Sequence, residues 1–296
     1  LWSPEVRAEF EETVAVLEKA NATREEGQIE AAARALDQLC GRRLPKIENA
    51  GLRENVEVFL VAIVIALAMA AAGAKVAVTG RTLEKLEKTV SMIAERGGEA
   101  IALTCNVKSA DDLTNIVDET VARLGSVDIL VNNAQEVPIG NLLDVTDEAF
   151  MAGFESGPLA SFRLMKLVHP HMVARGGGTI FNLASSAGIR WDMSSYGAYG
   201  AVKQATRALT RAGAAEWGRQ GIRVLTIAPH AESPGLKWWI ENNPEEATAF
   251  FKTIPLGRIG KLEEDIGRAV VTLCGPDMGY LTGTTIPLDG GQANFD

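Results

Sequence analysis

The chain has 296 residues, 47% of them hydrophobic, so it can bury a large core. Its formal net charge of −9 argues against a nucleic-acid binder, because such proteins need a basic field to neutralise phosphates. Three widely spaced cysteines without a CxxC pair fit a reducing compartment, so we expect a cytoplasmic protein. We predict no metal site, because the spacing of His169 and His171 points them in different directions on a helix.

Residues 1–50 are predicted to form a helical extension. Ser3 and Pro4 are a good N-cap and first residue for one helix, and residues 28–40 form a second that ends near Gly41. We expect this extension to pack on the core or on a partner. The predicted domain division is therefore a helical extension over 1–50 and an α/β domain over 51–296.

Residues 58–74 form an uncharged run, VFLVAIVIALAMAAAGA, with two interpretations. One interpretation is membrane contact through residues 55–74. A membrane-spanning helix needs about 20 apolar residues, so the run is short for that role. The favoured interpretation is a buried strand followed by a buried helix, because the alanine-rich half leads directly into a strand that needs a helix beside it.

Strand-like and helix-like stretches alternate through the rest of the chain. The predicted strands are 75–79, 100–104, 129–132, 179–183, 223–228 and 285–288. Such alternation implies parallel βαβ units with helices on both faces of the sheet. We therefore predict a Rossmann-like doubly wound α/β fold with a ligand crevice at the carboxyl ends of the strands.

Three side chains are candidates for catalysis. Tyr199 and Lys203 are four residues apart, so on a helix they share one face, and the ammonium favours the phenolate and lowers the tyrosine pKa from about 10. An ordinary surface pair is the alternative. Ser185 follows the predicted strand 179–183 and can reach the same substrate oxygen. A serine nucleophile is disfavoured, since the chain has no GxSxG motif.

Five ordered blocks carry a resemblance to a known family. They are VDILVNNAQ (127–135), FNLASSAG (181–188), YGAVK (199–203), GIRVLTIAP (221–229) and the pair IPLGRIGKLEEDIGRAVVTL with YLTGTTIPLDGG (254–291). In order and spacing they resemble the short-chain dehydrogenases/reductases, close to the 3-oxoacyl carrier-protein reductase branch. The resemblance covers about residues 63–292.

The resemblance implies a catalytic role for each of the three candidates. Ser185 would orient the substrate oxygen, and Tyr199 would be its proton donor or acceptor. Lys203 would hold the nicotinamide ribose and depress the tyrosine pKa. The implied reaction is the interconversion of a carbonyl and an alcohol by a nicotinamide cofactor.

It also implies a set of cofactor-binding residues. Asn133 and Ala134 match the family segment beside the adenine-side ribose, Val107 matches one that borders the adenine, and Pro229 is a further cofactor position. Arg81 follows the second family strand, where an arginine can receive a 2′-phosphate. This points to NADP rather than NAD.

The chain departs from the family pattern at several positions. The glycine-rich turn that carries the pyrophosphate is degenerate, since no glycine occurs between Gly51 and Gly73. Gly157 aligns with the family's catalytic asparagine, which anchors a proton-relay water, and Gln135 replaces the glycine of NNAG. The segment GLRENVEVFLVAIVIALA (51–68) is weakly similar to the anchor region of bacterial type I signal peptidases, as if residues 1–62 had replaced the first strand and phosphate loop.

Two functions follow from these observations. The first is an NADP-linked oxidoreductase acting on a small-molecule carbonyl or alcohol, with Tyr199 exchanging the proton. The alternative is a cofactor-free reductase-like scaffold that binds or regulates a partner or catalyses a non-redox proton transfer. The resemblance also implies a homodimer or homotetramer.

Overall fold

The computed structural model describes residues 48–189, 195–232 and 234–293, so the predicted helices in residues 1–47 lie outside the described part. The chain divides into two compact units. One comprises Leu1–Arg53 with Glu232–Phe250, and the other comprises Glu54–Ala231 with Phe251–Asp296. Helices α9 (Pro234–Asn242) and α10 (Pro244–Phe251) lie in or at the edge of the first unit. The strands and the candidate site residues described below belong to the second unit.

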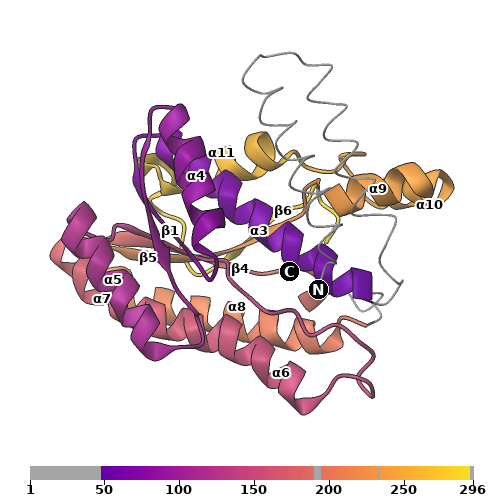
Figure 1. Cartoon of the computed structure of the whole chain (residues 1–296), viewed down its shortest axis with the longest axis horizontal. Helices are drawn as coiled ribbons and strands as arrows, with labels where there is room; N and C mark the ends of the chain where they lie inside the picture. The colour runs from indigo at the N-terminus through magenta and orange to yellow at the C-terminus, as the bar shows by residue number, and fades with distance from the viewer. Residues whose placement is uncertain (1–47, 190–194, 233, 294–296) are drawn as a thin grey trace. The chain divides into compact units, whose positions relative to one another are not determined.

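The second unit has a Rossmann-like α/β fold with parallel strands (Figure 1). The strands form a two-stranded sheet, β1-β2, and a four-stranded sheet in the order β3-β4-β5-β6. Their bounds are β1 Lys75–Gly80, β2 Glu99–Thr104, β3 Ile129–Asn132, β4 Gly178–Leu183, β5 Ile222–Pro229 and β6 Thr285–Leu288. The six strands predicted from residue 75 onward are confirmed, and each pairs in parallel with its neighbour.

The strand predicted at the start of the 58–74 run is wrong, because helix α3 runs unbroken over Glu48–Ala71. A uniformly apolar run does not distinguish strand from helix by its periodicity, and its alanine-rich end favours helix. The predicted burial is confirmed: Val61, Ile65 and Met69, four residues apart, are buried on one face. In the part of the chain that the structure describes, no helix is long and apolar enough to cross a membrane.

Helices cover both faces of the strands. Figure 1 shows α3, α4 and α11 on one side and α5, α7 and α8 on the other. The helices are α4 Leu83–Glu95, α5 Ala110–Leu124, α6 Asp147–Phe154, α7 Ala160–Ala174, α8 Gly197–Trp217 and α11 Arg268–Cys274, with short π or 3-10 turns η1 Glu155–Leu159, η2 Ser186–Gly188, η3 Gly218–Gln220, η4 Leu262–Gly267 and η5 Pro276–Met278. Ser109 and Thr146 cap α5 and α6 by accepting backbone N–H bonds.

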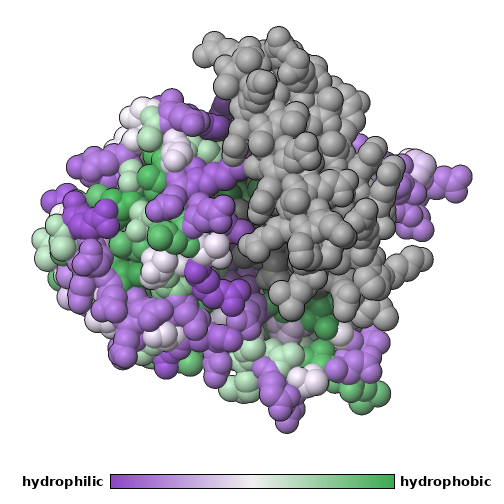
Figure 2. Space-filling view, in the orientation of Figure 1, coloured by the Kyte–Doolittle hydropathy of each residue, from purple (hydrophilic) through white to green (hydrophobic). Residues whose placement is uncertain are grey.

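Alternate residues of the central strands enter two separate core clusters. On β5, Val224 joins the cluster with α5 and α7, while Leu225 joins the one with α3 and α11. On β4, Ile180 and Phe181 divide in the same way. This alternation follows from the period of two in a strand, and it makes both faces of the sheet apolar. On the face shown in Figure 2 the described surface is mostly hydrophilic.

Helix α3 contacts both sheets. Val61, Ile65 and Met69 pack in the cluster that contains Phe181 and Leu225 of the four-stranded sheet. The neighbouring stripe Leu67 and Ala70 packs with Ile93 of α4 and with side chains of β1 and β2, among them Val78 and Ala100. No strand of the described chain joins β1 to β3. Side chains of α3 pack in both clusters, and Val76 of β1 contacts both as well.

We predict that Ile65→Ala lowers the free energy of unfolding by about 2–4 kcal/mol, because it removes a side chain that is 3% exposed between α3 and the four-stranded sheet. Chemical denaturation followed by circular dichroism measures this change. Leu143→Ala is the control, since that side chain is fully exposed at 100%. Equal effects of the two substitutions would contradict the placement of α3.

Candidate functional site

Tyr199 and Lys203 lie on one face of α8, as the YxxxK spacing predicts, and that face is buried. They are 7% and 3% exposed, so the alternative of a surface pair is wrong. The Lys203 Nζ lies 5.3 Å from the centroid of the Tyr199 ring and donates a hydrogen bond to the Leu183 carbonyl at 2.8 Å. That carbonyl ends β4, so the bond places the lysine head at the carboxyl end of the central sheet.

The turn that carries Ser185 packs directly on α8. A Cβ added at Gly200 would lie 2.9 Å from the Ala187 carbonyl oxygen, so this close approach requires a glycine. Gln204 fastens the same turn by donating to the Gly188 carbonyl at 2.6 Å. The Ser185 hydroxyl oxygen accepts the Ala187 N–H at 3.2 Å. The helix of Tyr199 and the turn of Ser185 are therefore held together at one end of β4.

A chain of buried polar side chains fixes α8 on the sheet beneath these residues. Asn132 donates to Asn182 at 2.8 Å, and Asn182 donates to the Thr210 hydroxyl of α8 at 2.9 Å. Thr226 of β5 donates to the same hydroxyl at 2.8 Å. Asn182, Thr210 and Thr226 are at most 1% exposed, and buried bonds of this kind hold a helix in one register.

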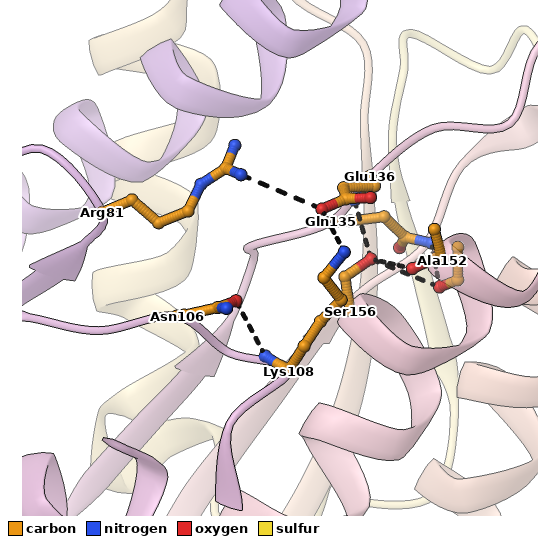
Figure 3. A network of polar contacts seen from close by, with 8 residues as sticks. Arg81, Asn106, Lys108, Gln135, Glu136, Ala152 and Ser156 are labelled. Carbon is orange, nitrogen blue, oxygen red and sulfur yellow. Dashed lines mark hydrogen bonds and ion pairs between the residues drawn. The ribbon is translucent and has the colours of Figure 1, made fainter. Parts of the chain in front are cut away.

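Two cations and a carboxylate meet where β1, β2 and β3 end (Figure 3). The Glu136 carboxylate lies 2.9 Å from the Lys108 Nζ and 3.9 Å from the Arg81 Nη1. Arg81 is a predicted cofactor residue, whereas Lys108 and Glu136 were missed by the sequence analysis. Their one signal in the sequence is that they directly follow Val107 and Gln135.

The loop that carries Lys108 is held by its own hydrogen bonds. The Asn106 N–H donates to the Asp112 carboxylate at 2.8 Å, and the Lys108 N–H donates to the Asn106 Oδ1 at 3.2 Å. The pKa of Asp112 is lowered by the Asn106 N–H and then by the Ser109 hydroxyl. These hydrogen bonds connect Asn106, Lys108 and Asp112 within the loop.

The helix between α6 and α7 widens into the π turn η1 at Gly157. Pro158 has no N–H for the carbonyl four residues earlier and its ring would collide with that carbonyl, which accounts for the wider turn. Ser156, 2% exposed, accepts the Glu136 N–H at 2.9 Å and donates to the Ala152 carbonyl at 2.7 Å. The segment after β3 is thereby tied to the helix.

Gln135 fills the space that a side chain at position 157 would need. A Cβ at Gly157 would lie 2.7 Å from the Gln135 Nε2 and 3.1 Å from its Oε1. The Gln135 amide also donates to the Gly153 carbonyl at 3.4 Å. The two departures from the family pattern, Gln135 and Gly157, are therefore neighbours in space. An amide side chain is present at this contact, but it comes from the loop after β3.

The remaining predicted cofactor residues lie at strand ends. Val107 follows β2 and packs against the core cluster that contains Leu113. Asn133 and Ala134 follow β3, with Asn133 partly buried and Ala134 exposed. Pro229 ends β5 opposite Leu288 of β6. All of these strands are parallel to their neighbours, so the predicted residues stand at carboxyl ends, the usual place for a ligand in such folds.

The strand ends carry residues that could hold the two ends of a dinucleotide, whereas the middle differs from the family pattern. Arg81 and Lys108 are cations that could contact a phosphate. Tyr199 and Lys203 offer a hydroxyl and an ammonium at the other end. Between them α3 runs without interruption through the position of the glycine-rich turn, so its internal N–H groups are already used in helical bonds. The chemistry of the side chains therefore suits the two ends of a dinucleotide, but the chain lacks the usual backbone site for its pyrophosphate.

We predict strong coupling between positions 135 and 157. Gly157→Ala should destabilise the protein by about 1 kcal/mol, because its methyl group collides with the Gln135 amide. In a Gln135→Ala background the same change should be neutral or stabilising, since alanine favours a helix over glycine. Urea unfolding of the four proteins measures the coupling energy, and additive effects within about 0.5 kcal/mol would contradict the contact.

Comparisons with known proteins agree with this architecture. Residues 61–293 match the family model described as enoyl-(acyl carrier protein) reductase. The 12alpha-hydroxysteroid dehydrogenase of Clostridium sp. is 34% identical over 234 residues, which cover 77% of this chain and 90% of that protein. A structure of 7alpha-hydroxysteroid dehydrogenase with NADH and 7-oxo glycochenodeoxycholic acid is 32% identical with a TM-score of 0.73, covering 79% of this chain and 90% of that one.

A variant of actinorhodin polyketide ketoreductase with NADPH is 30% identical with a TM-score of 0.72, and the match covers 79% of this chain and 94% of that one. The family match begins within α3 and includes the six strands of the described chain and every predicted site residue. The chain belongs to the short-chain dehydrogenase/reductase family.

Proposed function

We propose that this protein is an NADP-linked oxidoreductase that interconverts a carbonyl and an alcohol, with Tyr199 as the proton donor or acceptor. The observation that carries the proposal is the buried Tyr199 and Lys203 pair, held against the Ser185 turn at the end of β4. Relatives named hydroxysteroid dehydrogenases support an oxidoreductase of this class.

Each of the three residues has a distinct part in this proposal. The Tyr199 hydroxyl exchanges a proton with the substrate oxygen. Lys203, fixed by the Leu183 carbonyl, places a positive charge beside the tyrosine ring, which favours the phenolate. Ser185 donates its hydroxyl proton to the substrate oxygen and orients it. The nicotinamide, when bound, supplies or accepts the hydride.

The cofactor is assigned to residues on both sides of the site. Lys203 holds the nicotinamide ribose, Pro229 borders that end, and Asn133 and Ala134 border the adenine-side ribose. Arg81 receives a 2′-phosphate, because a guanidinium matches phosphate geometry and stays charged. Two structural relatives are described with NADH and with NADPH, so a nicotinamide cofactor is consistent with the family.

The substrate we propose is a small-molecule ketone or secondary alcohol, either cyclic or on an acyl chain. Relatives named hydroxysteroid dehydrogenases and a polyketide ketoreductase support a substrate of this class. We also propose a cytoplasmic homodimer or homotetramer in which residues 1–50 form a separate extension.

The test is a titration of the purified protein with NADPH and NADH, followed by nicotinamide fluorescence. We expect NADPH to bind more tightly than NADH, and Arg81→Ala to raise the NADPH Kd about tenfold or more by removing a charge-assisted contact. No binding of either nucleotide at millimolar concentration would overturn the proposal. It would favour the alternative of a cofactor-free scaffold.

A second prediction concerns the proton step. Tyr199→Phe should lower kcat by about 100-fold or more with little change in NADPH affinity, since it removes only the exchanging hydroxyl. Tyr280→Phe is the matched control, because Tyr280 is fully exposed. Steady-state kinetics with a panel of cyclic and acyl-chain ketones measures the effect. Equal activity of the two variants would exclude Tyr199 as the proton donor.

A further inference from the structure

Two cations and one carboxylate come together where strands of the two sheets end. Arg81 follows β1, Lys108 lies in the loop after β2, and Glu136 lies in the loop after β3 (Figure 3). The Glu136 carboxylate is 2.9 Å from the Lys108 Nζ and 3.9 Å from the Arg81 Nη1. One carboxylate therefore faces two cations, and its contact with Arg81 joins the loops of two different sheets.

The backbone on both sides of this contact is fixed. The Glu136 N–H donates to the buried Ser156 hydroxyl at 2.9 Å. The Lys108 carbonyl accepts a bond from the Arg163 Nη1 at 3.3 Å, and its N–H is held by Asn106. Only the side chains need to move for the groups to separate, and they are accessible: 72% exposed for Arg81, 31% for Lys108 and 37% for Glu136.

A phosphate at this place competes directly with Glu136. Arg81 is the proposed ligand of a 2′-phosphate, and Lys108 is a second cation within reach of the same carboxylate. A phosphate monoester carries nearly two negative charges at neutral pH, so it gains from both cations and is repelled by the carboxylate between them. A ribose 2′-hydroxyl, in contrast, can donate a hydrogen bond to an acidic residue.

We propose that Glu136 is a specificity-determining residue that limits the preference for a 2′-phosphorylated dinucleotide. In the free protein its carboxylate occupies Arg81 and Lys108, and a 2′-phosphate displaces it to bind them. A cofactor with a free 2′-hydroxyl leaves the ion pairs in place. This inference rests on the proposed function, since it concerns the cofactor of that reaction, and it makes Lys108 a second phosphate ligand.

The test compares NADPH and NADH binding in the full-length protein and in Glu136→Gln, by nicotinamide fluorescence at low ionic strength. The amide keeps the shape of the side chain and removes its charge. We expect the NADPH Kd to fall about 5- to 20-fold and the NADH Kd to change less than about twofold, because only the phosphate meets the lost charge. Lys108→Ala in the Glu136→Gln background should reverse most of the gain.

Glu99→Gln is the matched control. Glu99 begins β2 and pairs with Lys75 of β1 at 2.9 Å. This variant therefore removes one carboxylate charge at the end of β1 and β2 opposite to Arg81 and Lys108. It should leave both affinities unchanged. Thermal denaturation of each variant shows that it is folded, and the gain should shrink in 0.5 M NaCl as salt screens the repulsion.

The outcomes separate the two proposals. If the wild-type protein binds nucleotide and Glu136→Gln leaves the NADPH Kd unchanged or raises it, the inference about Glu136 is overturned while the reductase proposal stands. If neither protein binds a dinucleotide, the proposed function fails. Adenosine 2′-monophosphate then decides the inference: binding by Glu136→Gln and not by wild type supports it, and no difference between the two overturns it.

Discussion

The packing of helix α3 against both sheets is the constraint on which the rest of this fold depends. Strands β1 and β3 have no strand of the described chain between them, so backbone hydrogen bonds do not join the two sheets. Apolar side-chain contacts join the two sheets instead. One stripe of α3 packs on the four-stranded sheet and the next stripe packs on β1, β2 and α4. Burial of this kind is not directional, and it therefore holds the sheets together without requiring the register that a bridging strand would impose.

This arrangement divides the site into parts held by different forces. The Tyr199 and Lys203 end stands on the four-stranded sheet, where buried hydrogen bonds through Asn182 and Thr210 fix α8. The Arg81 end stands on the two-stranded sheet, and an exposed ion pair to Glu136 is its contact with the loop after β3. Exposed pairs contribute little to stability, so they can be exchanged for a ligand at small cost. A rigid Tyr199 and Lys203 end and an exchangeable charged end follow from how the strands are joined.

Much of this could be predicted from the sequence. The six strands from residue 75 onward follow from short apolar runs bounded by turns, and the YxxxK spacing correctly placed Tyr199 and Lys203 on one helix face. That this face is buried is seen only in the structure. The strand predicted within the 58–74 run was wrong, because an apolar run without polar residues has no readable period. Lys108 and Glu136 were missed because their meeting depends on three loops far apart in the chain. In the sequence, Gln135 and Gly157 are two separate departures from the family pattern. Only the fold shows that the Gln135 side chain fills the space that a side chain at position 157 would need.

The missing glycine turn changes where dinucleotide affinity must originate. In the family pattern, backbone N–H groups at a helix start bind the pyrophosphate, and here α3 already uses those groups internally. The chain as a whole carries a charge of −9, so long-range attraction does not replace them. For the proposed NADP-linked reaction, the remaining sources of affinity are Lys203 at the nicotinamide end and, at the adenosine end, Arg81 and Lys108 beside Glu136. Without a backbone phosphate loop at the centre, the charge balance of those last three side chains has more influence on the proposed affinity.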